Sequence, residues 1–247
     1  TWNGRGYCDT PLEVGLGNPI HSDTIARVVQ GGALRIVCLG RPDRSDAASR
    51  VTREAVSLGS EGVYVIPEEG SSSGEFDQGA IDWRGELGSA QWLITTSSTV
   101  LEGGARKSAW GASIAFAELE GSRTVMIVDK PDDGSRIEES WGSVIERIRQ
   151  VHILFIENGV IGEIARIEET GSSEILKQIR ESGLVPIVCS IDESRGLVGV
   201  EHSLGGFETV IEGATSAERW LAGFLSELPN SGPGPSGIEA AASRKLE

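Results

Sequence analysis

The feature that most constrains the fold of this chain is a repeated alternation of short apolar runs with amphipathic segments from residue 33 onward. The apolar runs, such as "ALRIVCLG" at 33–40 and "HILFIEN" at 152–158, do not alternate between polar and apolar residues. A strand with this pattern is typically buried on both faces, because helices cover both sides of a parallel sheet. The sequence therefore predicts an α/β protein with a mostly parallel central sheet between two layers of helices.

The alternation also predicts the order of the elements. We expect strands in the apolar runs at 33–40, 62–68, 91–98, 124–129, 152–158 and 185–191. We expect helices in the intervening segments at 45–59, 104–121, 138–150 and 172–183. A hairpin return at 195–202 and an amphipathic helix within 212–229 follow. We expect one domain, 1–247, with an irregular segment at 1–25 and a Pro- and Gly-rich linker at 229–237 before a short final helix.

The charge and composition of the chain exclude several kinds of partner. The formal net charge is −15 and Lys and Arg do not cluster, so we expect no binding to nucleic acid or to an anionic membrane. No run of 18 apolar residues predicts a membrane span. The cysteines and histidines lack metal-ligand spacing, which disfavours a zinc site and indicates free thiols in a reducing cytoplasm: Cys8, Cys38, Cys189, His21, His152 and His202.

Polar residues follow the predicted strands at their carboxyl ends, which is where ligands bind in a parallel α/β sheet. These positions are Gly40-Arg41, Ser97-Ser98, Asp129, Glu157-Asn158 and Ser190 to Asp192. A ligand cleft at this edge is one interpretation. The other is that these residues are polar only because loops lie at the surface.

Several segments, in their order along the chain, resemble the ribokinase-like (PfkB) carbohydrate kinases, nearest the 2-keto-3-deoxygluconate kinase branch. "IDWRGELGSAQWLITTSSTV" (81–100) resembles a helix and strand that lead to the substrate loop, and "GARKSAWGASIAFAELEGSRTVMIVD" (104–129) the next helix and strand. "IRQVHILFIEN" (148–158) resembles the strand that carries metal-linked residues. "ERWLAGFLSEL" (218–228) resembles the catalytic helix, and "IEAAASRKLE" (238–247) the helix that closes the adenine site.

This resemblance implies a three-layer α/β/α fold and ATP-dependent, Mg²⁺-assisted phosphoryl transfer to a hydroxyl group of a sugar or sugar acid. It implies Glu218 as the catalytic base, with phosphate held at Ala214, Thr215, Ser216 and Ala217. It implies nucleotide contacts at Ser190, Asp192, Gly196, Ala240, Ala241 and Ser243. It implies substrate contacts at Asp9, Gly17, Asn18, Ser97 and Asp129, and metal-linked residues at Asn158 and Glu163. A homodimer built through a β lid is also implied.

The chain departs from the family pattern at several motifs. The signature turn Gly-Ala-Gly-Asp falls on 215–218, which contains no glycine, so close approach of the backbone to phosphate is harder. Glu in place of Asp also lengthens the proposed base by one methylene. A second register places the motif on 213–216 and leaves Ser216 at the base position. Glu163 comes two residues too late for the family's Asn-x-x-Glu spacing, and 1–15 is too short for a first strand with a full lid, so we expect the lid to be reduced or absent.

Two roles for Glu218 therefore remain open, one structural and one catalytic. Thr215 and Glu218 have the spacing of a capping box, in which the carboxylate serves the helix and not the chemistry. If Glu218 is a base, the chain is a sugar kinase, though a weak one. If it is a cap, the chain is a catalytically inactive pseudokinase that acts as a binding or regulatory subunit. A third hypothesis is an unrelated doubly wound α/β protein, although no G-x-G-x-x-G follows the first strand.

Overall fold

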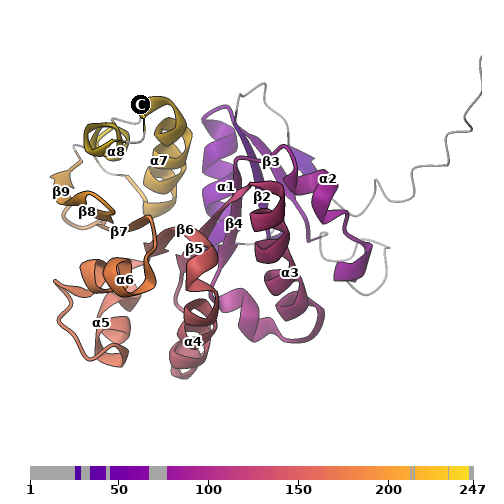
Figure 1. Ribbon diagram of the computed structural model, residues 1–247, viewed down its shortest axis with the longest axis horizontal. Helices are drawn as coiled ribbons and strands as arrows, with labels where there is room; N and C mark the ends of the chain where they lie inside the picture. Colours follow the sequence, from indigo (N-terminus) through magenta and orange to yellow (C-terminus); the bar gives the residue numbers. More distant parts are fainter. Residues whose placement is uncertain are drawn as a thin grey trace, which may run out of the picture.

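The computed structural model describes residues 26–28, 34–42, 45–66, 77–211, 213, 215–232 and 234–244. These residues form one nine-stranded sheet in the order β1-β3-β2-β4-β5-β6-β7-β8-β9 (Figure 1). The strands are β1 Ala26–Val28, β2 Arg35–Cys38, β3 Glu61–Tyr64, β4 Trp92–Thr96, β5 Arg123–Val128, β6 Val151–Ile156, β7 Ile187–Asp192, β8 Leu197–His202 and β9 Gly205–Val210.

The central strands, from β3 through β2, β4, β5 and β6 to β7, all pair in parallel. Antiparallel pairing is confined to the two edges, where β1 pairs with β3 and where β8 and β9 follow β7. The prediction of a mostly parallel sheet is therefore confirmed, as is the hairpin return that becomes β8. The last strand, β9, was not predicted: it begins with two glycines, and as an exposed edge strand it lacks the continuous apolar pattern of the central strands.

The helices form two layers, one on each face of the sheet (Figure 1). One layer contains α2 Trp83–Leu87, α3 Gly104–Glu120, α4 Ile137–Arg147, α5 Asn158–Ile167 and α6 Ile175–Gly183. The other contains α1 Ala47–Ser57, α7 Ala217–Ser231 and α8 Pro235–Ala242. This is the three-layer α/β/α arrangement expected from the sequence.

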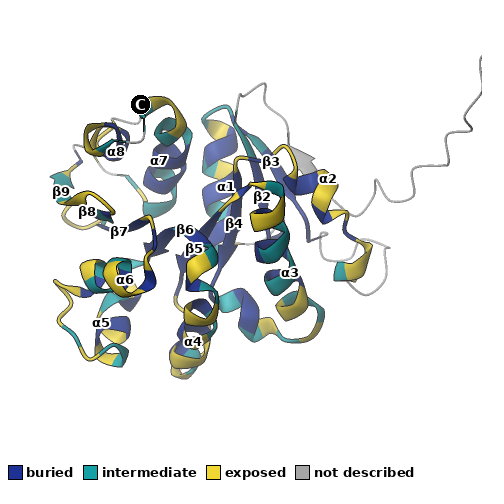
Figure 2. Ribbon diagram, in the orientation of Figure 1, coloured by how far each residue is buried: buried dark blue, intermediate teal, exposed yellow. Residues whose placement is uncertain are grey.

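Strand β2 and the residue after it show why the apolar runs are continuous. Ile36 and Cys38 face the core beside α1, α7 and α8, while Val37 and Leu39 face the core beside α2 to α6. All four side chains are at most 1% exposed, and Figure 2 shows the same burial along the neighbouring strands. The central strands are therefore mostly apolar along their length, because both of their faces lie against helices.

The linker predicted at 229–237 is wrong for most of its length. Helix α7 continues through Pro229 to Ser231, and α8 already begins at Pro235. Proline lacks the N–H that would bond to the carbonyl four residues earlier, which belongs to Leu225. The indole Nε1 of Trp92 donates to that carbonyl at 3.2 Å, so the helix passes the proline without leaving the acceptor unpaired.

Some expectations fall on residues outside the described ranges. These are the irregular segment 1–25 with Asp9, Gly17 and Asn18, and with them the reduced lid and the lid-mediated homodimer, which stay predictions. Among the helices that the structure describes, none has the length and apolar character needed to cross a bilayer.

Candidate functional site

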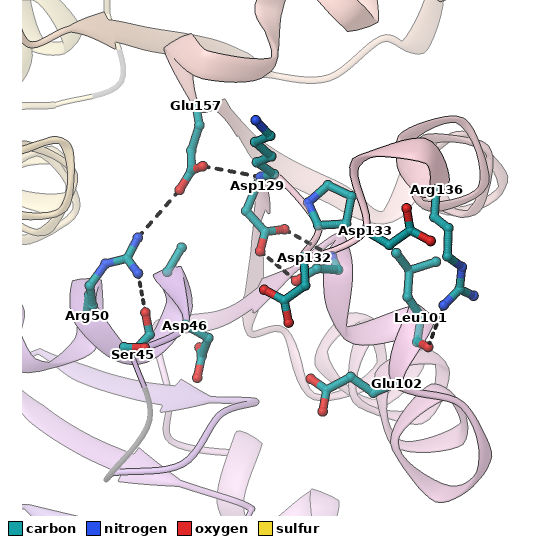
Figure 3. Close-up of a pocket in the computed structure, with 14 residues that line it drawn as sticks. Ser45, Asp46, Arg50, Leu101, Glu102, Asp129, Asp132, Asp133, Arg136 and Glu157 are labelled. Carbon is teal, nitrogen blue, oxygen red and sulfur yellow. Dashed lines mark hydrogen bonds and ion pairs between the residues drawn. The ribbon is translucent and has the colours of Figure 1, made fainter.

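A cleft of about 590 Å³ lies at the carboxyl ends of the central strands (Figure 3). Its walls come from the amino end of α1 and from the segments that follow β4, β5 and β6. Ser45, Asp46 and Arg50 line one side, and Leu101 and Arg136 the other. The side chains of Asp129 and Glu157 approach from the sheet between them. This is the edge at which the topology of a parallel sheet places ligands.

Asp129, directly after β5, is the most tightly held carboxylate of the cleft. Its Oδ1 accepts hydrogen bonds from the Ser97 Oγ and the Ser98 backbone N–H, both at 3.0 Å. Its Oδ2 accepts from the Ser98 Oγ at 2.5 Å. Asp129 is only 8% exposed, and this burial raises its pKa above the ordinary value despite the three hydrogen bonds. The structure thus brings together two of the predicted substrate residues, Ser97 and Asp129.

Arg50 connects the cleft to helix α7. Its guanidinium lies 3.6 Å from the Glu157 carboxylate after β6 and 2.6 Å from the Glu218 carboxylate on α7. Glu157 also accepts from the backbone N–H of Lys130 at 3.3 Å. Burial, and then the charge of Asp129, raises the pKa of Glu157. Arg50 therefore fixes two carboxylates that belong to elements distant in the sequence.

The amino end of α7 is capped by Ser216, so the predicted Thr215–Glu218 capping box is wrong by one residue. The Ser216 Oγ accepts from the backbone N–H of Arg219 at 3.2 Å. The N–H of Ala217 donates to the carboxylate of Glu193, which lies in the turn after β7. The hydroxyl of Thr215 is buried and has no hydrogen-bond partner among the described residues. Of the predicted phosphate-binding residues, Ala214 lies outside the described ranges.

Glu218 is held as an ionised partner of Arg50. Burial alone raises its pKa, but hydrogen bonds from its own backbone N–H and from Arg50 bring the pKa below the ordinary value. A carboxylate with a lowered pKa accepts a proton less readily, so this environment weakens Glu218 as a general base.

None of the predicted nucleotide residues lines the cleft. They lie in two places, at the end of β7 with the turn after it and at α8. Ser190 and Asp192 lie on β7, and Gly196 follows in the turn to β8 with a positive φ of 60°. Asp192 accepts hydrogen bonds from both the backbone N–H and the Oγ of Ser194. The remaining three lie at α8: Ala241 is buried, Ala240 is exposed, and the Ser243 Oγ lies 3.2 Å from the Thr209 Oγ1.

Asn158 and Glu163, the predicted metal-linked pair, are both exposed on α5 and do not line the cleft. Five helical positions separate them, which turns their side chains about 140° apart around the helix axis. Among the described residues, no three His, Cys, Asp or Glu side chains form a group that could hold a metal ion. The described side chains therefore do not fit a Mg²⁺ ion at this pair.

The cleft contains two functional candidates that the sequence did not point to, Asp46 and Arg50. They lie beside Ser98 and Glu157, which were expected only as polar residues after strands. Each of the four lies just after a central strand or in the first turn of the following helix, and that position is the signal that could have identified them. Carboxylates outnumber cationic side chains along the lining by six to three: Asp46, Glu102, Asp129, Asp132, Asp133 and Glu157 against Arg50, Lys130 and Arg136. The cleft can accept hydrogen bonds from several hydroxyl groups, and its charge is negative.

No protein-family model and no curated protein sequence matches the chain. Solved structures do match it. A fructokinase from Vibrio cholerae, in its fructose, ADP and potassium ion bound form, has a TM-score of 0.62 and 13% identity, over 86% of this chain and 89% of that one. A putative ribokinase II from E. coli, in complex with ATP and Mg²⁺, has a TM-score of 0.61 and 9% identity, over 86% and 93%.

The 2-dehydro-3-deoxygluconokinase of Thermotoga maritima has a TM-score of 0.58 and 13% identity, over 85% of this chain and 90% of that one. These neighbours share the architecture along most of their length, while their sequences agree at few positions. The order of the sequence motifs predicted the same architecture. The chain therefore has the ribokinase-like (PfkB) sugar-kinase fold.

Proposed function

We propose that the chain binds a neutral, hydroxyl-rich small molecule such as a sugar in the cleft, and that it has lost efficient phosphoryl transfer. The fold supports the first part, since the solved fructokinase from Vibrio cholerae holds fructose and shares this architecture. The lining supports it too, because Asp129 and Glu157 present carboxylate oxygens that accept hydrogen bonds from sugar hydroxyl groups.

One observation supports the loss of phosphoryl transfer. Side chains of the chain itself already accept hydrogen bonds from N–H groups at the amino end of α7. Free N–H groups at a helix amino end attract phosphate. Here the Ala217 N–H is bonded to Glu193 and the Arg219 N–H to Ser216. A phosphate group at this turn would have to displace the Glu193 carboxylate, which has the same sign of charge and the same attraction to the helix end.

The charge of the cleft selects a neutral sugar over a sugar acid. Six carboxylates and three cations line the cleft. Two of the cations and two of the carboxylates are in ion pairs: Arg50 with Glu157 and Glu218, Arg136 with Glu139, and Glu102 with Arg106. The other lining charges are four carboxylates against one cation, namely Asp46, Asp129, Asp132 and Asp133 against Lys130. The substrate carboxylate of a sugar acid would therefore enter a negative field. Like charges at close range in a partly dehydrated site cost more than they do in water.

An active kinase is the second candidate, and the position of Glu218 favours it. Glu218 lies 2.6 Å from Arg50, which lines the cleft, so its carboxylate is close to the space where a sugar hydroxyl would lie. In this candidate Glu218 is the base, and ATP and Mg²⁺ are used as the resemblance implies. The candidate requires Glu193 to leave the end of α7 when the nucleotide binds.

Calorimetric titration with D-fructose, D-ribose and D-gluconate tests the proposed ligand class. We expect heat from a neutral sugar and none from gluconate. Asp129→Asn is expected to weaken sugar binding about tenfold or more, since a hydrogen bond to a charged group contributes about 1.5–3 kcal/mol. Glu163→Gln is the matched control, because Glu163 is an exposed carboxylate outside the cleft. Tighter binding of gluconate than of either sugar would contradict the proposal.

Sugar-dependent release of ADP from Mg·ATP separates the two candidates. We expect no turnover from the natural chain, and tighter binding of a non-hydrolysable ATP analogue by Glu193→Gln, which removes the competing charge from the end of α7. Turnover by the natural chain that Glu218→Gln abolishes, with the melting temperature nearly unchanged, would instead establish the kinase.

A further inference from the structure

A second cavity, of about 520 Å³, lies at the opposite, amino-terminal edge of the sheet. It is bounded by the first residues of β4, β5, β6 and β7 and by the end of α7 with α8. Most of its lining is apolar: Trp92, Ile153, Ile187, Leu228, Pro229 and Ile238. Its size is within the range of small-molecule sites, about 300–1,000 Å³, and an apolar lining with few polar groups is their usual character.

The polar groups of this second cavity are Arg123, His152 and Ser203. His152 is placed there by an irregularity in the pairing of β5 with β6. Thr124 pairs with Val151 and Val125 with Ile153, so His152 is an extra residue in β6. The Nδ1 of His152 lies 3.3 Å from the backbone nitrogen of Thr124, whose N–H donates to it. Such bulges turn a side chain toward a new direction and occur often beside functional sites.

Arg123 supplies the positive charge of this cavity. Its guanidinium lies 5.8 Å from the centre of the Trp92 ring, and no carboxylate of the described residues forms an ion pair with it. Trp92 itself is fixed, because it is only 1% exposed and its indole N–H bonds to Leu225. Burial, and then the charge of Arg123, lowers the pKa of His152, so its ring is uncharged near neutral pH. Arg123 is therefore a cationic group beside an apolar cavity, in a chain whose net charge is −15.

We propose that this second cavity binds a small carboxylate with an apolar body, whose carboxylate pairs with Arg123 and whose body packs against the apolar lining. The side chain of His152 adds a polar contact at the mouth. The site is at the far edge of the sheet from the cleft, so the proposal does not depend on the proposed function. Arginine is suited to this task because its planar guanidinium binds a carboxylate through two parallel hydrogen bonds.

Phenylacetate and its uncharged analogue phenylacetamide test the proposal, titrated into the full chain by calorimetry. We expect phenylacetate to bind about two- to fivefold more tightly, because Arg123 is exposed and an exposed ion pair contributes up to about 1 kcal/mol. Arg123→Met is expected to remove this preference and leave both probes equally weak. Arg149→Met is the matched control, since Arg149 is an exposed arginine that does not line the cavity.

Ser203→Phe provides a second, steric test, because Ser203 lines the cavity and is exposed in the turn after β8. The aromatic ring is expected to abolish binding of both probes while the melting temperature stays within a few degrees of that of the natural chain. The proposal is overturned if phenylacetate gives no heat, if it binds Arg123→Met as well as the natural chain, or if Ser203→Phe leaves its binding unchanged.

Discussion

Asp129 is a carboxylate whose burial costs the fold stability. It is 8% exposed, and its raised pKa means that the folded chain holds the carboxylate in an environment that disfavours the charge. Ser97 and Ser98 compensate only in part, by donating three hydrogen bonds. Buried groups of this kind are concentrated at functional sites, where a charge is kept ready for a ligand.

The substitution Asp129→Asn is therefore expected to raise the melting temperature at pH 7. An asparagine has the same shape, its Oδ1 accepts the same two hydrogen bonds, and the Ser98 hydroxyl can reverse to accept from its amide. The raised pKa fixes the sign of the pH dependence. The cost of the charge is present above the folded-state pKa and is relieved as the pH falls through it, so the advantage of the variant shrinks on acidification. Melting curves between pH 7 and pH 4 measure this.

Asp192→Asn is the contrasting control. Asp192 is only partly buried, and hydrogen bonds from Ser194 lower its pKa. Its carboxylate therefore favours the folded state above the unfolded-state pKa and loses that effect as the pH falls. We expect this variant to be slightly less stable than the natural chain at pH 7. An Asp129→Asn variant that melts lower at pH 7, by an amount that does not change with pH, would show that the hydrogen bonds outweigh the burial of the charge.

At the scale of elements, helix α7 depends on one hydroxyl for its amino-terminal cap. Ser216→Ala removes the bond to the Arg219 N–H and is expected to lower the free energy of unfolding by about 0.5–2 kcal/mol. Thr215→Val is the matched control one residue earlier, because the Thr215 hydroxyl is buried without a hydrogen-bond partner among the described residues. We expect it to be neutral or slightly stabilising. Urea unfolding compares the two variants. A larger loss of unfolding free energy in Thr215→Val than in Ser216→Ala would support the capping box predicted from the sequence.

The same helix shows where prediction from sequence ends. Its apolar positions, which are buried from Trp220 to Leu225, fixed its existence and its buried face. Its first residue was less certain, because Thr215 and Ser216 are both good caps and only the path of the chain decides between them. The hydrogen bond from the Ala217 N–H to the Glu193 carboxylate could not be predicted, since it joins a turn to a helix that lies far from it in the sequence.

In the other elements too, local patterns were predictable and long-range contacts were not. The strands of the sheet centre were predictable because burial on both faces leaves a local, continuous apolar pattern. Helix α5 was missed, because Gly159 and Gly162 lower its helix propensity and its stability comes from Val160 and Ile164 packing on the sheet. The edge of the sheet at which the cleft lies was predictable from topology. The bridge from Arg50 to Glu157 was not, because charge pairing across more than a hundred residues has no local signature.

At the scale of the whole molecule, the charge of the chain is unevenly placed. Carboxylates dominate the cleft at the carboxyl edge of the sheet, whereas Arg123 gives the cavity at the amino edge its charge. Because the central strands are parallel, the cleft and the cavity lie at opposite edges of the sheet, and these two edges differ in charge. The net charge of −15 adds a general repulsion among exposed carboxylates, which favours expanded states of the chain.

Added salt is therefore expected to stabilise the fold. Between about 0.01 M and 0.15 M ionic strength the screening length falls from about 30 Å to about 8 Å, which suppresses repulsion between distant carboxylates more than attraction within close ion pairs. The urea midpoint should rise over this range. In the double variant Asp132→Asn and Glu163→Gln, two exposed carboxylates outside any ion pair of the described residues are neutralised, so the rise should be smaller. A midpoint that falls with salt would mean that the close pairs of Arg50 with Glu157 and Glu218 outweigh the repulsion across the molecule.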